Sequence, residues 1–282
     1  MIGHLFEPMG QYRIALAWFH EGLTHARAGN HREREATLLS DIGRVLGVLG
    51  EFAEALEYLK NAEPTIMSTC GLHALLAIRT RKATIYAVMQ DFQPARAELE
   101  WVVADAERHG YITEYVDGLM RLAEVELRSG DIARGAEVAR VAADVAKQSG
   151  SARSRAFASC TLAEALIASD DVPHARELLL AVASGHLDGH SLKEDLDLLR
   201  AFVERAALLA DAEKRVYLSR DYRILAANLA ALLRDEGMYR TYEHQSSLEA
   251  LFEQIVRVNT TMGLVDNSDA TKGNAHDGRQ QD

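Results

Sequence analysis

The chain has 282 residues, of which 48% are hydrophobic and 26% are charged, so it is long and apolar enough to bury a large core in one or two domains. Its formal net charge of −11 at pH 7 repels phosphate backbones and disfavours nucleic acid as a partner of this chain. Two cysteines, Cys70 and Cys160, cannot make a disulfide framework.

A short signature recurs with a constant step of 40 residues, which indicates a repeat architecture. Each copy has an anchor residue, an aromatic or β-branched residue two positions later, and a small residue five positions after the anchor. Apolar residues spaced by three and four positions predict one helix before the anchor and one after it. The anchors are Gly10, Gly50, Gln90, Gly130 and Asp170, and the small residues are Ala15, Ala55, Ala95, Gly135 and Ala175.

The first repeat lacks its first helix, because too few residues precede Gly10. The helix predicted over 11–28 is therefore expected to leave Tyr12 and Phe19 partly exposed, with Trp18 beside them. Stacked repeats need covered ends, and three explanations stay open. The favoured one is that the chain begins inside a longer natural protein. The others are that a second copy or an N-terminal partner covers this face through Tyr12, Trp18 and Phe19, or that the end frays.

The second repeat carries the clearest pattern. Its small and large residues resemble the tetratricopeptide repeat (TPR), whose usual length is about 34 residues. The resemblance implies an all-α fold in which antiparallel helix pairs form a right-handed superhelical solenoid. The longer step of 40 residues resembles the repeats of bacterial regulators. The residues that carry the resemblance are Leu39, Ile42, Gly43, Leu46, Gly50, Phe52, Ala55, Leu59 and Ala62.

The third repeat departs from this pattern, whereas the fourth and fifth keep it. Arg79 and Lys82 stand where apolar residues are expected, so we expect the first helix of the third repeat to have slipped in register. Regular repeats are predicted over residues 10–184.

The 40-residue step is lost after residue 184. Ser191 and Glu194 form a capping box that predicts a helix to about Ala212. Two further helices are predicted over 215–235 and 237–257. The sequence thus predicts a helical repeat domain over 1–258, with irregular C-terminal helices over 190–258, and a disordered polar tail over 259–282.

Targeting signals are not evident in the sequence. The start of the chain has no basic stretch followed by an apolar run, as a secretory signal requires. The apolar run at Ala226–Leu233 is far shorter than the roughly 20 residues that cross a bilayer. We therefore expect a cytoplasmic protein that does not enter a membrane.

Catalytic and metal-binding motifs are also missing from the sequence, which has no phosphate-binding glycine loop, HExxH, GxSxG or CxxC. His186, Asp188 and His190 could hold zinc, but a structural site needs four ligands and a loop is preferred. Cys160 lies near Arg153 and other charges that give its thiol no clear activation, so it is interpreted as a small buried or half-buried residue. No catalytic residue, metal or cofactor is predicted, and we expect a protein that is not an enzyme.

The resemblance implies that the first helix of each pair lines a concave groove in which ligands are held. A protein or peptide ligand, extended or helical, with apolar anchors and some basic character, is expected there. The alternative is that these positions form the solvated faces of a scaffold. The groove residues carried over from the family pattern are Ser40, Arg44, Met120, Glu124, Phe157, Cys160 and Glu164.

Two functions follow from these observations. The first is a non-catalytic scaffold that binds a protein or peptide in its groove. The alternative is the sensor or regulatory region of a larger bacterial transcriptional or signalling regulator, whose output domain lies outside this chain. Fold alone does not decide between them.

Overall fold

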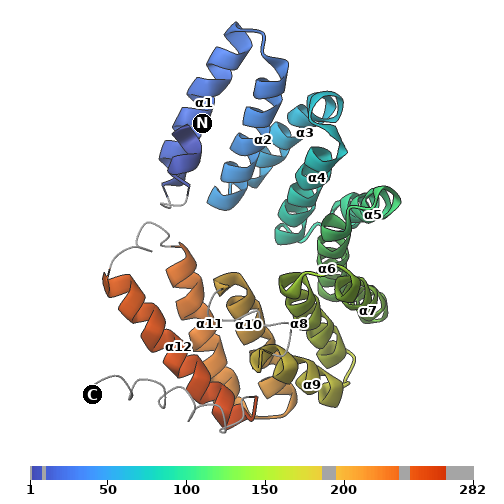
Figure 1. The fold of residues 1–282 in the computed structure, drawn as a ribbon, viewed down its shortest axis with the longest axis vertical. Helices are drawn as coiled ribbons and strands as arrows, with labels where there is room; N and C mark the ends of the chain where they lie inside the picture. The colour runs from blue at the N-terminus through green and yellow to red at the C-terminus, as the bar shows by residue number, and fades with distance from the viewer. Residues whose placement is uncertain (1, 8–10, 186–194, 235–241, 265–282) are drawn as a thin grey trace, which may run out of the picture. The chain divides into compact units, whose positions relative to one another are not determined.

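The computed structural model describes residues 2–7, 11–185, 195–234 and 242–264, and within these residues every regular element is helical (Figure 1). The chain divides into two compact units, the first with η1 and α1–α7 and the second with α8–α12. The elements are η1 (Ile2–Leu5), α1 (Tyr12–Ala28), α2 (Arg32–Leu49), α3 (Phe52–Thr69), α4 (Gly71–Val88), α5 (Phe92–His109), α6 (Ile112–Ser129), α7 (Ile132–Gln148), α8 (Ala152–Ala168), α9 (Val172–Ala183), α10 (Leu196–Ala212), α11 (Val216–Arg234) and α12 (Tyr242–Met262).

Consecutive helices pack as antiparallel pairs, and the anchors Gly50, Gln90, Gly130 and Asp170 lie in the turns inside these pairs, whereas Gly10 lies outside the described residues. We call the first helix of a pair its A helix (α2, α4, α6, α8) and the second its B helix (α3, α5, α7, α9), and α1 is the B helix of the first repeat. Gly50 and Gly130 end α2 and α6 with φ of 82° and 93°. Gln90 and Asp170 take the same left-handed conformation, with φ of 62° and 64°. This conformation ends the A helix and turns the chain back along it.

The small residue of each signature lies where the helices of the repeat meet. Ala15, Ala55 and Ala95 all have 0% of their surface exposed. In the α2/α3 pair, a methyl group on Gly43 would lie 2.7 Å from Cγ of Leu59 and 3.0 Å from the carbonyl oxygen of Ala55. These distances leave no room for a larger side chain, so the small residues set how closely the two helices approach.

The third repeat keeps the register of the others, and the predicted slip of its first helix is wrong. Lys82 lies one step of 40 residues from Ile42 and from Leu122, and all three side chains are buried. Lys82 can be buried because it pairs with Glu63 on α3 and Glu98 on α5. The ammonium nitrogen of Lys82 lies 2.6 Å from a carboxylate oxygen of Glu63 and 2.5 Å from one of Glu98. Two anionic partners from the neighbouring B helices thus allow a cation to occupy a core position.

Arg79 belongs to the same cluster of charges. Its guanidinium donates to Glu98 at 3.1 Å and lies over the ring of Trp101, 4.1 Å from the ring centre. Although burial lowers the pKa of Lys82, the hydrogen bonds and negative charges of Glu63 and Glu98 outweigh burial and raise it. Lys82 therefore stays charged around neutral pH.

Residues 2–7 cover the face of α1 that the sequence left open. Phe19 is 1% exposed, and a methyl group on Gly3 would lie 2.6 Å from the Phe19 ring. The ring of His4 meets the Phe19 ring edge-on, with 4.9 Å between ring centres. The prediction that Phe19 is open to a second copy or partner is therefore wrong, because one turn of 3-10 helix is enough to cover one ring. Tyr12 is half-buried, and Trp18 is 39% exposed.

The C-terminal helices of the second unit differ in their bounds from the prediction. The α10 helix begins after Asp195, whose side chain accepts the backbone N–H of Leu198 at 3.0 Å. The predicted capping box at Ser191 and Glu194, and the group His186, Asp188 and His190, lie outside the described residues.

The last helix continues past the predicted start of the polar tail at residue 259. The Tyr222 hydroxyl donates to the Asn259 side chain at 2.6 Å, and both residues are buried. Met262 and Leu264 are also buried, with 1% and 0% exposed. The predicted tail boundary is therefore wrong, because these side chains hold the end of α12 against its neighbours. Residues 265–282 lie outside the described residues.

The close approach of α2 and α3 predicts that Ala55 tolerates no larger side chain. We expect Ala55→Leu to lower the free energy of unfolding by about 1–3 kcal/mol, because it overpacks the contact. Ala53→Leu makes the same change at an exposed position of α3 and is expected to alter it by less than about 0.5 kcal/mol. Thermal melts followed by circular dichroism compare the two. Equal loss from both variants would contradict the packing argument.

The charge cluster predicts a large effect at Lys82. We expect Lys82→Met to destabilise the chain by about 3–5 kcal/mol, because Glu63 and Glu98 then have only Arg79 as a nearby cation and one carboxylate charge is left uncompensated. The double variant Lys82→Met/Glu63→Gln removes one charge of each sign, leaves Arg79 paired with Glu98, and is expected to recover most of the loss. Denaturant melts of both variants test this, and a double variant no more stable than the single one would show that charge is not the cause.

Candidate functional site

The A helices of the first unit form one continuous side of that unit. Figure 1 shows α2, α4 and α6 following one another along this side, with α3, α5 and α7 along the other. Side chains bridge successive A helices: Arg81 on α4 donates to the Ser40 hydroxyl on α2 at 3.1 Å, and Arg121 on α6 donates to the Thr84 hydroxyl on α4 at 3.2 Å. We call this surface the A-helix face. It is defined by Ser40, Asp41, Arg44, Arg81, Thr84, Asp117, Met120, Arg121 and Glu124.

Arg44, a predicted groove residue, is held by two carboxylates close to it. Its guanidinium donates through both terminal nitrogens to the two carboxylate oxygens of Glu7, with 2.8 Å between Nη2 and Oε1. It also lies 3.4 Å from Asp41 on the same helix. Although burial raises the pKa of Glu7, the hydrogen bond and charge of Arg44 outweigh it and lower this pKa below its ordinary value. Glu7 is therefore ionised at neutral pH.

His4 extends this network on the side of the N-terminal segment. Its Nδ1 lies 2.9 Å from a Glu7 oxygen, and its Nε2 lies 3.2 Å from an Asp41 oxygen. Burial raises the pKa of Asp41 above its ordinary value, in spite of the lowering effect of the nearby His4 and Arg44 side chains. Residues 2–7 thus bring an imidazole and a carboxylate onto the same part of the A-helix face as Ser40 and Arg44.

Arg81 and Arg121 are functional candidates that the sequence analysis missed. Together with Arg44 they place one arginine of the A-helix face on each of α2, α4 and α6. Within the described ranges, Arg81 has no carboxylate at ion-pair distance, and burial followed by the charge of Arg44 lowers its pKa. Arg81 and Arg121 are 40 residues apart. Aligning the polar positions at the 40-residue step, as was done for the apolar positions, would have identified both arginines.

The predicted residues of α6 lie on the same face as these arginines. Met120 and Glu124 are both half-buried. Asp117 accepts a hydrogen bond from Arg121 on its own helix at 2.9 Å. Burial lowers the pKa of Arg121, but the charges of Asp117 and Glu124 outweigh it. The negative charges of α6 therefore act on Arg121 of the same helix, whereas the carboxylates that contact Arg44 are those of Glu7 and Asp41.

The three remaining predicted groove residues belong to α8 in the second unit. Cys160 is 1% exposed, lies in the hydrophobic core of that unit, and has its thiol pKa raised by burial to about 12. The prediction that Cys160 lines an open groove is therefore wrong, because α10 packs against α8. Glu164 shows the same contact, since its carboxylate lies 2.8 Å from the guanidinium of Arg205 on α10. Phe157 is half-buried, with the guanidinium of Arg153 4.7 Å from its ring centre.

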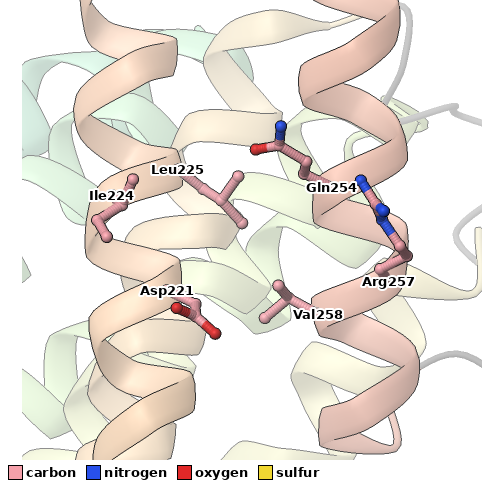
Figure 2. Close-up of a pocket in the computed structure, with 6 residues that line it drawn as sticks. All are labelled: Asp221, Ile224, Leu225, Gln254, Arg257 and Val258. Atoms are coloured by element: carbon pink, nitrogen blue, oxygen red, sulfur yellow. The ribbon is translucent and has the colours of Figure 1, made fainter.

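A second candidate site is an open pocket between α11 and α12, which the sequence analysis did not anticipate (Figure 2). Leu225 and Val258 point from the two helices into the space between them, and Asp221 and Arg257 lie on opposite helices. It combines an apolar floor with one charge of each sign. Its residues are Asp221, Ile224, Leu225, Gln254, Arg257 and Val258.

In the part of the chain that the structure describes, no group of three or more His, Cys, Asp or Glu side chains is arranged to hold a metal ion. No helix there is both long and apolar enough to cross a membrane.

Comparisons with known proteins place the fold among helical repeat proteins. Scans against protein-family models and curated sequences give no match. A putative kinesin light chain of Podosopora anserina with nearly identical TPR-like repeats is 20% identical, with a TM-score of 0.52 over 75% of this chain and 99% of that one. BtubC (BKLC) of P. vanneervenii is 13% identical, with a TM-score of 0.60 over 78% of this chain and 91% of that one. The fold is therefore an all-α, TPR-like solenoid of helix pairs, as the resemblance implied.

The burial of Cys160 predicts a difference in reactivity between the two thiols. At pH 8 we expect a thiol-specific chromogenic reagent to modify one cysteine of the native chain, the half-buried Cys70, because Cys160 is inaccessible and stays protonated. Both cysteines react after denaturation in guanidinium chloride. The variant Cys70→Ser serves as the control and should show no fast reaction when native. A native Cys160 that reacts as fast as Cys70 would contradict the assignment.

Proposed function

We propose that this chain is a non-catalytic repeat scaffold that binds a segment of a partner protein on the A-helix face of its first unit. The TPR-like solenoid supports a role in protein interaction, since such folds present long surfaces built from successive repeats. One observation carries the choice of surface. Arg44, Arg81 and Arg121 contribute one guanidinium from each successive A helix, and hydrogen bonds between Arg81 and Ser40 and between Arg121 and Thr84 hold two of them in place.

Arginine suits this role chemically. A guanidinium has five N–H donors in a rigid plane and accepts no hydrogen bond. Each arginine of the A-helix face uses only some of its donors in the contacts described above, and the remainder can bind carbonyl or carboxylate oxygens of an extended segment. Asp117 already accepts from Arg121. We therefore propose a ligand that offers carbonyl or carboxylate oxygens to the arginine N–H donors. This replaces the partly basic ligand that the sequence favoured.

A capture experiment with matched charge reversals tests the proposed surface. The intact chain, carrying an affinity tag, is used to isolate binding proteins from cells that express it, and the affinity of a captured protein is then measured after purification. Arg81→Glu and Arg121→Glu reverse a charge on the A-helix face. Arg140→Glu makes the same change on the exposed side of α7 and is the control.

We expect the two A-helix-face variants to weaken binding of the purified partner at least tenfold and the Arg140→Glu variant to change it less than twofold. Isothermal titration calorimetry gives the affinities, and circular dichroism confirms that each variant keeps its helices. Unchanged affinity in Arg81→Glu and Arg121→Glu would place the binding surface elsewhere, and the α11/α12 pocket would be tested next with Asp221→Lys and Arg257→Glu.

A further inference from the structure

Glu7 is bound to the A-helix face as a ligand would be bound. It belongs to no helix pair, because it follows η1 in the short segment 2–7. Its carboxylate nonetheless receives both terminal nitrogens of Arg44, the two-point geometry in which a guanidinium recognises a carboxylate. The residue before it, Phe6, packs against the hydrophobic core of the first unit. The segment therefore presents an aromatic anchor followed by an acidic side chain to this face.

The charges that remain on the face without Glu7 favour another carboxylate in its place. Asp41 would then be the carboxylate near both arginines, because Arg44 contacts it directly and its negative charge also acts on Arg81. Two guanidinium groups beside one carboxylate leave a net positive site on a chain whose net charge is −11. The neighbouring Asp41 opposes a doubly charged phosphate more strongly than a singly charged carboxylate.

Segment 2–7 is held by fewer contacts than a helix of the solenoid. Its apolar side chains Ile2 and Leu5 are 52% and 68% exposed. Its close contacts are those of Gly3 and His4 with Phe19, of Phe6 with the core, and of His4 and Glu7 with α2. Segments with few buried contacts open at low free energy while the rest of the fold stays intact. An external segment can therefore take its place without unfolding a repeat.

We propose that Arg44 and Arg81 form a carboxylate-binding site for an acidic segment of a partner protein, and that Glu7 is its displaceable internal occupant. This inference rests on the proposed function, because it specifies the ligand of the A-helix face. The internal segment also indicates the ligand's form: an aromatic residue followed by Glu or Asp. Since a tethered segment acts at an effective concentration in the millimolar range, it weakens the binding of any partner until it is displaced.

A peptide with the sequence of residues 1–10, labelled with a fluorophore, is the probe. Fluorescence anisotropy measures its binding to the full-length wild type and to the full-length variant Gly3→Leu/Glu7→Lys. The Gly3 substitution cannot be accommodated against Phe19, and the Glu7 substitution repels Arg44, so the variant releases its own segment. We expect the variant to bind the peptide at least tenfold more tightly than the wild type does.

Two matched controls identify the contact. A peptide in which glutamine replaces the glutamate is expected to bind the released variant at least tenfold more weakly than the acidic peptide does. Adding Arg44→Gln to the variant is expected to abolish the preference between the two peptides, whereas adding Arg140→Gln is expected to leave it unchanged. If circular dichroism shows that Gly3→Leu/Glu7→Lys loses helix, Glu7→Lys alone replaces it in every comparison.

The inference is overturned if a folded, released variant fails to bind the acidic peptide, or if it binds both peptides equally well. Its failure is distinguishable from failure of the proposed function. Suppose that a partner binds Arg121→Glu more weakly than the wild type but binds the released variant no more tightly. The A-helix face would then remain the binding surface, and only the role of Glu7 as an internal occupant would be rejected.

Discussion

The structure depends on how closely the two helices of each repeat can approach. At Gly43 the backbone of α2 lies so near α3 that a single added methyl group would touch Leu59 and the carbonyl oxygen of Ala55. Short axial distance lets the flanking Leu and Ile side chains fill the interface without voids. It also fixes the length of the turn, so each anchor must reverse the chain within one or two residues. With short turns, the 18-residue length of each helix in the second and third repeats accounts for the 40-residue step.

Those constraints explain how much of the fold could be predicted from the residues. The spacing of apolar and small residues identified the helix pairs, because two helices can approach this closely only where small residues lie between them. The apolar pattern gave the wrong register for the third repeat, because a lysine is not expected at a core position. Lys82 can be buried there only because Glu63 and Glu98, which lie on other helices, pair with its charge. The same pattern predicted that Phe19 is partly exposed, because it gives no signal for a short segment such as residues 2–7 that packs over the ring.

The candidate site was predicted less completely, for a related reason. Ser40 and Arg44 do lie on the A-helix face, since a helical face follows from spacing alone. Their partners do not follow from it: Glu7 reaches Arg44 from outside the repeats, and Arg81 was missed because polar positions were not aligned at the 40-residue step. Cys160 is buried, as its sequence context indicated, but its assignment to the groove was wrong, because α10 packs on α8 where the 40-residue step is lost and the repeat pattern does not predict that contact.

The buried Lys82 has a consequence for how this solenoid could have grown. Repeats with apolar interfaces are interchangeable, and a duplicated unit can be inserted next to any other. The third repeat is not, because its lysine pairs with Glu98 on its own B helix and also with Glu63 on α3 of the preceding repeat. A copy moved elsewhere would keep Glu98 but lose the carboxylate of Glu63. We therefore expect α3, α4 and α5 to be kept together when repeats are exchanged.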